Sequence, residues 1–233
     1  MLDFFWRLFR AALLVVPVFV VLAYFLQEKL IFFPMKLENT PEYPTAIAQG
    51  CKVEPVNFSS LDGTKLAGIW IGAPGGASES ANPDRLMVLF SHGNGGNLTH
   101  YLEKSLDLVS SFSVNLFLYD YRGYGQSEGA PTVEGVVKDG LGALKYLEET
   151  RKIKRNRIVL FGYSLGTGVS TAMYRDSGGG FAGMVLESGF QSLRKRAVAR
   201  LSLLGALILK TNLPSDEILS GYKDPLLLLH SDA

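Results

Sequence analysis

A serine bracketed by glycines follows a short apolar run, and this arrangement most constrains how the chain can fold. Residues 158–161 read Ile-Val-Leu-Phe, and residues 162–166 fit the pattern G-x-S-x-G. The pattern is typical of a sharp strand-to-helix turn that exposes a nucleophilic serine. Gly162 and Gly166 suit such a turn because side chains there would collide with the strained backbone or the following helix. We interpret Ser164 as a candidate nucleophile; the alternative is an ordinary turn in a chain with 25 glycines.

Strands and helices are predicted to alternate around this turn. Apolar runs predict strands at 86–90, 114–119, 158–161, 184–186 and 226–229, with helices at 98–110, 132–149 and 165–175. Such alternation indicates a mostly parallel sheet with helices on both faces and its chemistry at the carboxyl ends of the strands. Ser164, the His-Gly-Asn of 92–94 and Glu187 all fall at such ends. An Asp-Gly pair at 62–63 predicts an antiparallel hairpin of strands 55–59 and 66–71 before this region.

Composition excludes several classes of function. The 233 residues are 47% hydrophobic, which suffices for the core of one large domain. A net charge of +1 argues against nucleic acid as a partner. Cys51 is the single cysteine, so an intramolecular disulfide is impossible, and burial as a small apolar residue is expected. The sequence has no metal-ligand spacing and no phosphate-binding loop, so we expect neither a metal nor a cofactor.

The N-terminal 35 residues predict a membrane anchor. Between Arg10 and Glu28 lie 17 uncharged residues, close to the lower limit for a helix that spans a bilayer. We expect an uncleaved signal anchor over residues 1–35, a bilayer partner and a globular domain over 36–233; a cleaved signal peptide is the alternative. Two basic residues on each side of the run leave its orientation undecided.

A segment of about 190–222 predicts an insertion into the domain. Four basic residues between 194 and 200 precede an apolar run at 201–209. One interpretation is a short lid over Ser164 that rests on anionic lipid. The other is a packing helix with a solvated basic end.

Six motifs, taken together, resemble one known family. They are Leu-Ile-Phe-Phe-Pro at 30–34, Asp-Gly-Thr-Lys-Leu-Ala-Gly at 62–68, His-Gly-Asn-Gly-Gly-Asn at 92–97, Tyr-Asp-Tyr-Arg-Gly-Tyr-Gly-Gln-Ser-Glu-Gly at 119–129, Gly-Tyr-Ser-Leu-Gly at 162–166 and Leu-Glu-Ser-Gly-Phe at 186–190. The chain resembles the membrane-anchored α/β-hydrolase-domain proteins, serine hydrolases related to the S33 peptidase-like group. The resemblance implies an α/β-hydrolase fold and cleavage of an ester or thioester in a small molecule or in an acylated lipid or protein. A serine peptidase is the weaker alternative.

The resemblance also implies roles for individual residues. Ser164 would form an acyl-enzyme, and the main-chain amides of Leu165 and Asn94 would form an oxyanion hole. His92 would brace the turn that holds Asn94, and Gly93 would leave room for amides to point at an anion.

The remaining members of a catalytic triad are not found at the family's positions. In this fold an acid and then a histidine follow the serine, but the histidines are His92, His100 and His230. By resemblance to the family, the acid would fall one residue beyond Ala233 and the histidine further on. Asp232 is a less favoured acid. We therefore expect the triad acid and histidine, and the last strand and helix, to be missing. The chain would then be a fragment of a working hydrolase or a catalytically inactive hydrolase-fold protein.

Overall fold

A computed structural model describes residues 2–39, 41–43, 46, 49–75, 85–201 and 212–230. Its main sheet has seven strands in the order β2-β3-β6-β4-β7-β8-β9. They are β2 (Lys52–Ser59), β3 (Lys65–Gly72), β4 (Met87–Ser91), β6 (Asn115–Tyr119), β7 (Ile158–Tyr163), β8 (Gly183–Glu187) and β9 (Leu226–Leu229). The predicted strands therefore all occur, to within a few residues at their ends.

The direction of the strands confirms a mostly parallel sheet. β2 pairs with β3, and β3 with β6, in antiparallel fashion, whereas β6, β4, β7, β8 and β9 are parallel neighbours. The predicted hairpin is thus correct. From β4 the chain continues to β6 on one side, and later to β7 on the other. Connections that diverge from the carboxyl end of a central strand create the crevice in which such sheets bind ligands.

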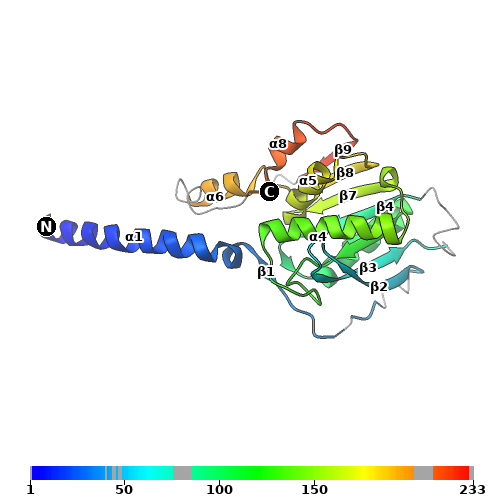
Figure 1. The fold of residues 1–233 in the computed structure, drawn as a ribbon, viewed down its shortest axis with the longest axis horizontal. Helices are drawn as coiled ribbons and strands as arrows, with labels where there is room; N and C mark the ends of the chain where they lie inside the picture. The colour runs from blue at the N-terminus through cyan, green and yellow to red at the C-terminus, as the bar shows by residue number, and fades with distance from the viewer. Residues whose placement is uncertain are drawn as a thin grey trace.

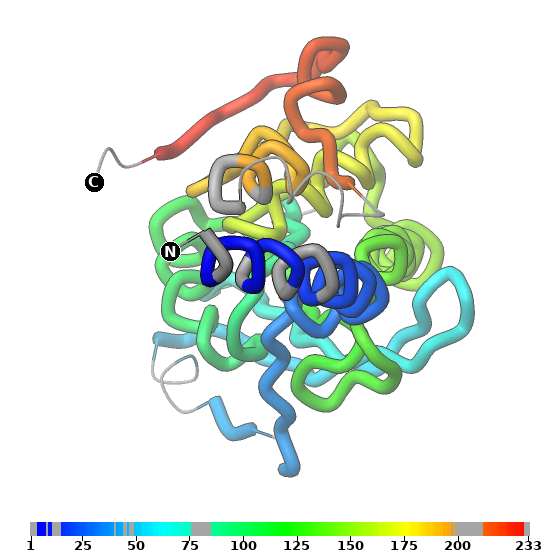
Figure 2. Tube along the Cα trace, turned by 90° about the vertical axis from the view of Figure 1, so that its left-hand side faces the viewer, coloured from blue at the N-terminus to red at the C-terminus, as the bar shows by residue number. Residues whose placement is uncertain are grey.

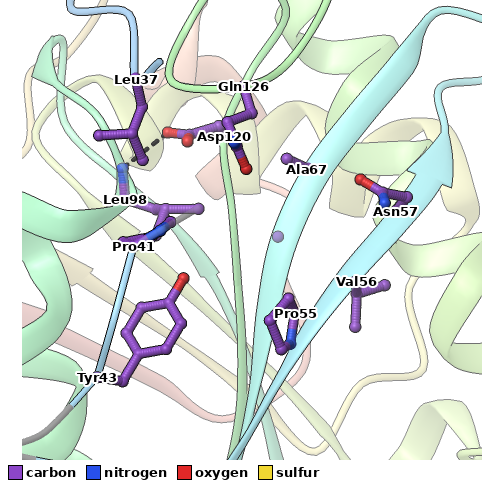
Figure 3. A pocket seen from close by; sticks show the side chains of 11 residues that line it. Leu37, Pro41, Tyr43, Pro55, Val56, Asn57, Ala67, Leu98, Asp120 and Gln126 are labelled. Carbon is purple, nitrogen blue, oxygen red and sulfur yellow. Dashed lines mark hydrogen bonds between the residues drawn. The ribbon is translucent and has the colours of Figure 1, made fainter. Parts of the chain in front are cut away.

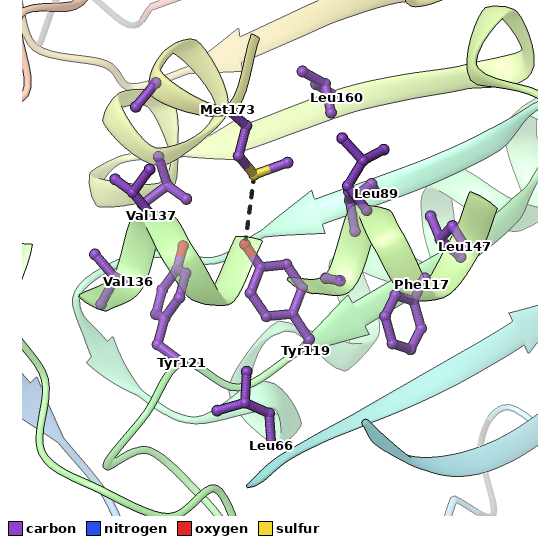
Figure 4. Close-up of a cluster of buried hydrophobic side chains, with 14 of the residues drawn as sticks. Leu66, Leu89, Phe117, Tyr119, Tyr121, Val136, Val137, Leu147, Leu160 and Met173 are labelled. Atoms are coloured by element: carbon purple, nitrogen blue, oxygen red, sulfur yellow. Dashed lines mark hydrogen bonds between the residues drawn. The ribbon is translucent and has the colours of Figure 1, made fainter. Parts of the chain in front are cut away.

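Helices cover both faces of the sheet (Figure 1). They are α3 (Leu102–Phe112), α4 (Val133–Lys145) and α5 (Leu165–Ser177). One apolar cluster packs α4 and α5 against Met87 and Leu89 of β4, and a second packs α3 against Val88 and Phe90. Successive residues of β4 point to opposite faces, so a strand covered on both faces must be apolar throughout. Figure 4 shows the first cluster, in which the Tyr119 hydroxyl points to Met173 of α5.

Two predicted helices differ in detail from those observed. The segment predicted as a helix over 98–110 begins as a 3-10 turn, η2 (Leu98–Tyr101), before α3 starts. The Asn97 side chain accepts a hydrogen bond from the Thr99 amide and so starts the turn before the α-helix. The helix predicted over 132–149 begins at its cap Thr132, but its last turn is the π-turn η3 (Tyr146–Thr150).

The N-terminal helix α1 (Leu2–Ile31) extends away from the domain (Figure 1). Within the part of the chain that the structure describes, no helix reaches the length and apolar character needed to cross a bilayer. The predicted transmembrane helix therefore has no support here. The uncharged run was short for a span from the outset, because Arg10 and Glu28 bound it.

The predicted insertion at 190–222 is described in part. It contains α6 (Leu193–Leu201) and the short helix α8 (Ser215–Leu219). Side chains of Arg194, Lys195 and Arg196 are exposed on α6. The apolar run that was predicted to follow them lies mostly outside the described residues.

A buried ion pair ties the β2–β3 hairpin to α4. The Arg122 guanidinium donates to both carboxylate oxygens of Asp139, at 2.7 Å to Oδ1, and its other end donates to Asp62 at 2.9 Å. The Asp139 side chain is fully buried. Burial raises the pKa of Asp139, and the Arg122 hydrogen bonds oppose that rise. The carboxylate therefore depends on Arg122 for its charge.

Replacing this arginine should destabilise the fold. In Arg122→Met the Asp139 carboxylate stays buried without its partner, so we expect a loss of about 3–5 kcal/mol in the free energy of unfolding at pH 7. Without Arg122, the pKa of the Asp139 carboxyl in the folded protein rises further above its unfolded value of about 3.9. The stability of the variant therefore falls as pH rises from the unfolded pKa to the folded pKa of Asp139. The deficit should be smaller at pH 4 than at pH 7 in urea titrations. Arg175→Met, which breaks the exposed pair with Asp176, is the matched control and should cost little. Equal losses in the two variants would contradict this account.

Candidate active site

Ser164 occupies a strained turn between β7 and α5. Its backbone has φ 51° and ψ −109°, a region that residues other than glycine rarely adopt. The Ser164 amide donates to the Glu187 carbonyl at 2.9 Å, and its own carbonyl accepts from the Thr167 hydroxyl at 2.7 Å. Strain of this kind costs about 1–3 kcal/mol and persists only where neighbours impose it, most often at functional sites. The predicted strand-turn-helix context is confirmed.

The two glycines of the turn permit a close approach of α5 to the sheet. A Cβ on Gly162 would lie 2.5 Å from the Gly166 carbonyl oxygen, so the predicted collision with the following helix is correct. A Cβ on Gly166 would lie 1.8 Å from the Ser91 carbonyl oxygen, at the end of β4. Gly166 is therefore needed because the helix meets the neighbouring strand, a contact that the local sequence does not reveal.

The same packing brings the loop of residues 92–97, hereafter the 92–97 loop, against the serine turn. The Gly166 Cβ position is 2.9 Å from the His92 carbonyl oxygen, and that of Gly93 is 3.1 Å from the Tyr163 ring. Leu165, the first residue of α5, is buried beside them. Ser164, Leu165 and Gly93 thus meet at the carboxyl ends of β4 and β7, where the sequence predicted them.

His92 is buried inside this loop and faces groups other than Ser164. Its Nδ1 lies 2.7 Å from the Gly93 carbonyl oxygen, and its Nε2 lies 3.4 Å from Asp120 Oδ1. The Tyr121 hydroxyl donates to the His92 carbonyl oxygen at 2.8 Å. These contacts favour the predicted supporting position over that of a general base.

Asp120 supports the end of the 92–97 loop. The amide of Leu98, the residue directly after the loop, donates to Asp120 Oδ1 at 2.7 Å. Asp120 does not pair with Arg122, because the Arg122 side chain binds Asp139 and Asp62.

A small cavity of about 80 Å³ adjoins the buried Asp120 carboxylate (Figure 3). Leu37, Pro41 and Tyr43 form one wall, and strands β2 and β3 form another. Burial and the negative charge of Asp120 raise the pKa of Tyr43 to about 12. The phenol therefore stays protonated and uncharged at neutral pH beside the Asp120 carboxylate.

Asn94 makes its side-chain contacts with a distant part of the chain. Its Nδ2 donates to the Ile31 carbonyl oxygen at the end of α1 at 2.5 Å, and its Oδ1 accepts from the Tyr124 hydroxyl at 3.0 Å. Tyr124 and Tyr101 also bond to carbonyl oxygens of this loop, at Asn94 and Gly95. Sequence reasoning missed both tyrosines; the aromatic residues in the 119–129 motif were the available signal for Tyr124.

Glu187, at the end of β8, is held by a residue that the sequence did not suggest. Lys104 of α3 places its Nζ 2.5 Å from Glu187 Oε1 and lies over the Tyr163 ring. The carboxylate therefore joins α3 to the strand end beside Ser164. Nothing in the local sequence marks Lys104, because the pair is formed by residues 83 apart.

The two remaining histidines lie elsewhere. His100 belongs to the cap of η2, where its Nδ1 accepts from the Asn97 amide at 3.3 Å. His230 follows β9, is exposed, and lines a pocket of about 330 Å³ with residues that include Thr167 and Leu229. Asp232, the less favoured acid, lies outside the described residues. Among the described residues, no group of three or more His, Cys, Asp and Glu side chains is placed to hold a metal ion.

The strand order together with a strained serine between β7 and α5 defines an α/β-hydrolase fold. Comparisons with known proteins agree. The family model described as serine aminopeptidase, S33, matches residues 82–231. Since this match includes more than half of the chain, the protein belongs to that family of α/β hydrolases.

Individual proteins are similar to this chain over part of their length. It is 32% identical to the α/β hydrolase domain-containing protein WAV2 of Arabidopsis thaliana, over 76% of this chain and 56% of that protein. It is 28% identical to the lysophosphatidylserine lipase ABHD12 of Danio rerio, over 72% and 50% of the two chains. An esterase of Pyrococcus furiosus shares the fold, with a TM-score of 0.60, 21% identity, and 85% of this chain and 76% of that chain covered. The chain thus spans about half to two thirds of the curated relatives' length.

The contact at Gly166 predicts a large effect of a single methyl group. In Gly166→Ala the new Cβ would overlap the Ser91 carbonyl, so α5 must move from β4 or the turn must relax. We expect a loss of about 3 kcal/mol or more in the free energy of unfolding, measured in urea. Gly221→Ala, where the nearest atom would be 3.8 Å from the Cβ, is the matched control and should change little. A Gly166→Ala protein as stable as the control would show that the helix does not depend on this contact.

Proposed function

We propose that the protein is a serine esterase that cleaves an ester or thioester through an acyl-enzyme on Ser164. The conformation of Ser164 carries this proposal, because a strained serine at the start of a helix and beside a glycine-rich loop matches the geometry that acyl transfer requires. The names of a similar lipase and a similar esterase support an ester substrate, whereas the name of the family model, serine aminopeptidase, keeps a peptide as the second candidate.

The residues divide the reaction as follows. The Ser164 Oγ attacks the carbonyl carbon of the substrate and loses its proton to a general base. The resulting oxyanion accepts hydrogen bonds from the main-chain amides of Leu165 and Asn94, and the alcohol or thiol then leaves with a proton. Water cleaves the Ser164 ester and releases the acid. His92 and Asp120 hold the 92–97 loop during these steps.

Neither His92 nor His100 is placed to act as the general base. His92 faces Gly93 and Asp120, and His100 belongs to a helix cap. In this fold the acid and the histidine follow the strands that come after the nucleophile. The chain spans only 56% and 50% of two curated relatives, so our proposed source of both residues is sequence that these 233 residues do not include.

A fluorophosphonate probe tests the nucleophile in protein expressed from the complete reading frame. We expect one label per chain, complete loss of labelling in Ser164→Ala, and unchanged labelling in Ser110→Ala, a control on the exposed face of α3. Folded wild-type protein that takes up no label would indicate a catalytically inactive hydrolase-fold protein. Faster hydrolysis of an aminoacyl anilide than of an acyl ester would favour a peptidase instead.

We also propose that α1 associates the protein with a membrane. Its described apolar side chains are largely exposed, with Phe19 65% and Phe25 69% accessible. Figure 2, which looks onto the side where α1 lies, shows α1 and α6 together in front of the domain. The exposed basic residues of α6 suit the anionic headgroups of a bilayer that α1 enters or lies on.

Acidic substitutions in α1 should release the protein from membranes. The double variant Val18→Asp and Leu22→Asp places two negative charges on one exposed face of α1. Burial of a valine or leucine side chain contributes about 1.5–3 kcal/mol, and an aspartate loses that contribution, so we expect at least about a tenfold rise in the soluble fraction after centrifugation. Phe112→Asp, on the exposed end of α3, is the control and should leave the distribution unchanged. An unchanged distribution in the α1 variant would exclude this role of the helix.

A further inference from the structure

The chain at the end of α1 lies directly beside the candidate active site. Residues 31–37, hereafter the strap, leave the end of the helix and pass beside the 92–97 loop. Within the strap, β1 (Phe33–Pro34) pairs in parallel with β5 (Gly95–Gly96), and the Met35 amide donates to the Gly96 carbonyl oxygen at 3.0 Å. The strap therefore forms a small sheet with the loop that holds Asn94.

The Asn94 side chain joins the strap to this loop a second time. Its amide nitrogen donates to the Ile31 carbonyl oxygen at 2.5 Å, and its oxygen accepts from the Phe33 amide at 3.4 Å. The Asn94 side-chain amide thus donates to one main-chain group of the strap and accepts from another. A residue in a neighbouring β-strand would form the same pair of hydrogen bonds. Asn97 adds a third contact, because its side chain donates to the Met35 carbonyl oxygen at 3.2 Å.

The opposite side of the strap binds the loop that follows β6. The Gly125 amide donates to the Met35 carbonyl oxygen at 2.9 Å, and the Leu37 amide donates to the Gly125 carbonyl oxygen at 3.1 Å. The Lys36 ammonium donates to the Ser127 carbonyl oxygen at 2.7 Å. Phe32, which is 3% exposed, anchors the strap in the main core.

The 92–97 loop needs such support because its own sequence is permissive. Three of its residues, at 93, 95 and 96, are glycines, and Gly96 has a φ of +86°. Glycine gives a loop many backbone conformations, so external contacts must select the one in which an amide points at the substrate.

We propose that the strap positions the 92–97 loop for catalysis, with the Asn94 side chain as a positioning residue, so that the placement of α1 is coupled to the oxyanion site. This inference rests on the proposed esterase function. Asn94 then has two separate parts: its main-chain amide faces the substrate, and its side chain fixes the direction of that amide through Ile31 and Phe33.

The variant Asn94→Ala separates these two parts, because it keeps the main-chain amide and removes the side-chain contacts. In the full-length protein we expect faster hydrogen exchange at the Met35, Leu37 and Leu98 amides. We also expect the maximal rate of fluorophosphonate labelling of Ser164 to fall about 10- to 100-fold, with the half-saturating probe concentration unchanged. Asn115→Ala is the matched control, since it removes one asparagine contact, to the Ala73 amide, at the start of β6. It should change neither measurement.

Three results would overturn the proposal. Unchanged exchange at these amides would show that Asn94 does not hold the strap. Faster exchange with an unchanged labelling rate would show that the loop keeps its geometry without the strap. If Asn94→Ala fails to fold, Lys36→Met loosens the strap from its other side, and normal exchange and labelling in that variant would be equally decisive. If the wild-type protein takes up no label, the proposed function fails. The hydrogen exchange of the Leu98 amide then decides by itself whether the strap holds the loop: unchanged exchange in Asn94→Ala would show that it does not.

Discussion

The contact between the first turn of α5 and the end of β4 governs the arrangement of this protein. Because residue 166 has no side chain, the helix approaches the Ser91 and His92 carbonyl groups closely enough that a methyl group could not be inserted. That approach forces the sharp turn at Ser164 and places the helix N-terminus beside the 92–97 loop. The site at the sheet edge is therefore a product of helix-to-strand packing rather than of the loops alone.

Polar support around this contact reaches the site from several elements, and it is buried except at the partly exposed Lys104–Glu187 pair. Asp120 holds the amide of Leu98, Tyr121 holds the carbonyl group of His92, and Lys104 holds Glu187. Hydrogen bonds of this kind restrict main-chain groups without approaching the reacting atoms. The nucleophile and its neighbouring amides therefore sit on a framework whose parts come from β6, α3 and the N-terminal segment.

Much of the fold could be predicted because its signals are local. The apolar runs located the strands, and the glycines at 162 and 166 located the turn at Ser164. The strap could not be predicted, since it binds chiefly through main-chain groups, which every sequence carries. Lys104 and the Arg122–Asp139 pair were missed for a related reason, because each joins residues that only the packed structure brings together. The membrane helix was predicted from the apolar composition of the N-terminal residues. The uncharged run between Arg10 and Glu28 was too short to decide whether the helix spans a bilayer.

The position of β4 at the centre of the sheet also has a kinetic consequence. Its partners are β6 and, much later in the sequence, β7, so the central pairing joins Val88 to Val159. Contacts of such long range are slow to form because a large loop must close first. During synthesis one edge of the apolar β4 stays unpaired until residues 158–163 have left the ribosome, and the nascent chain is open to aggregation or chaperone binding for that interval.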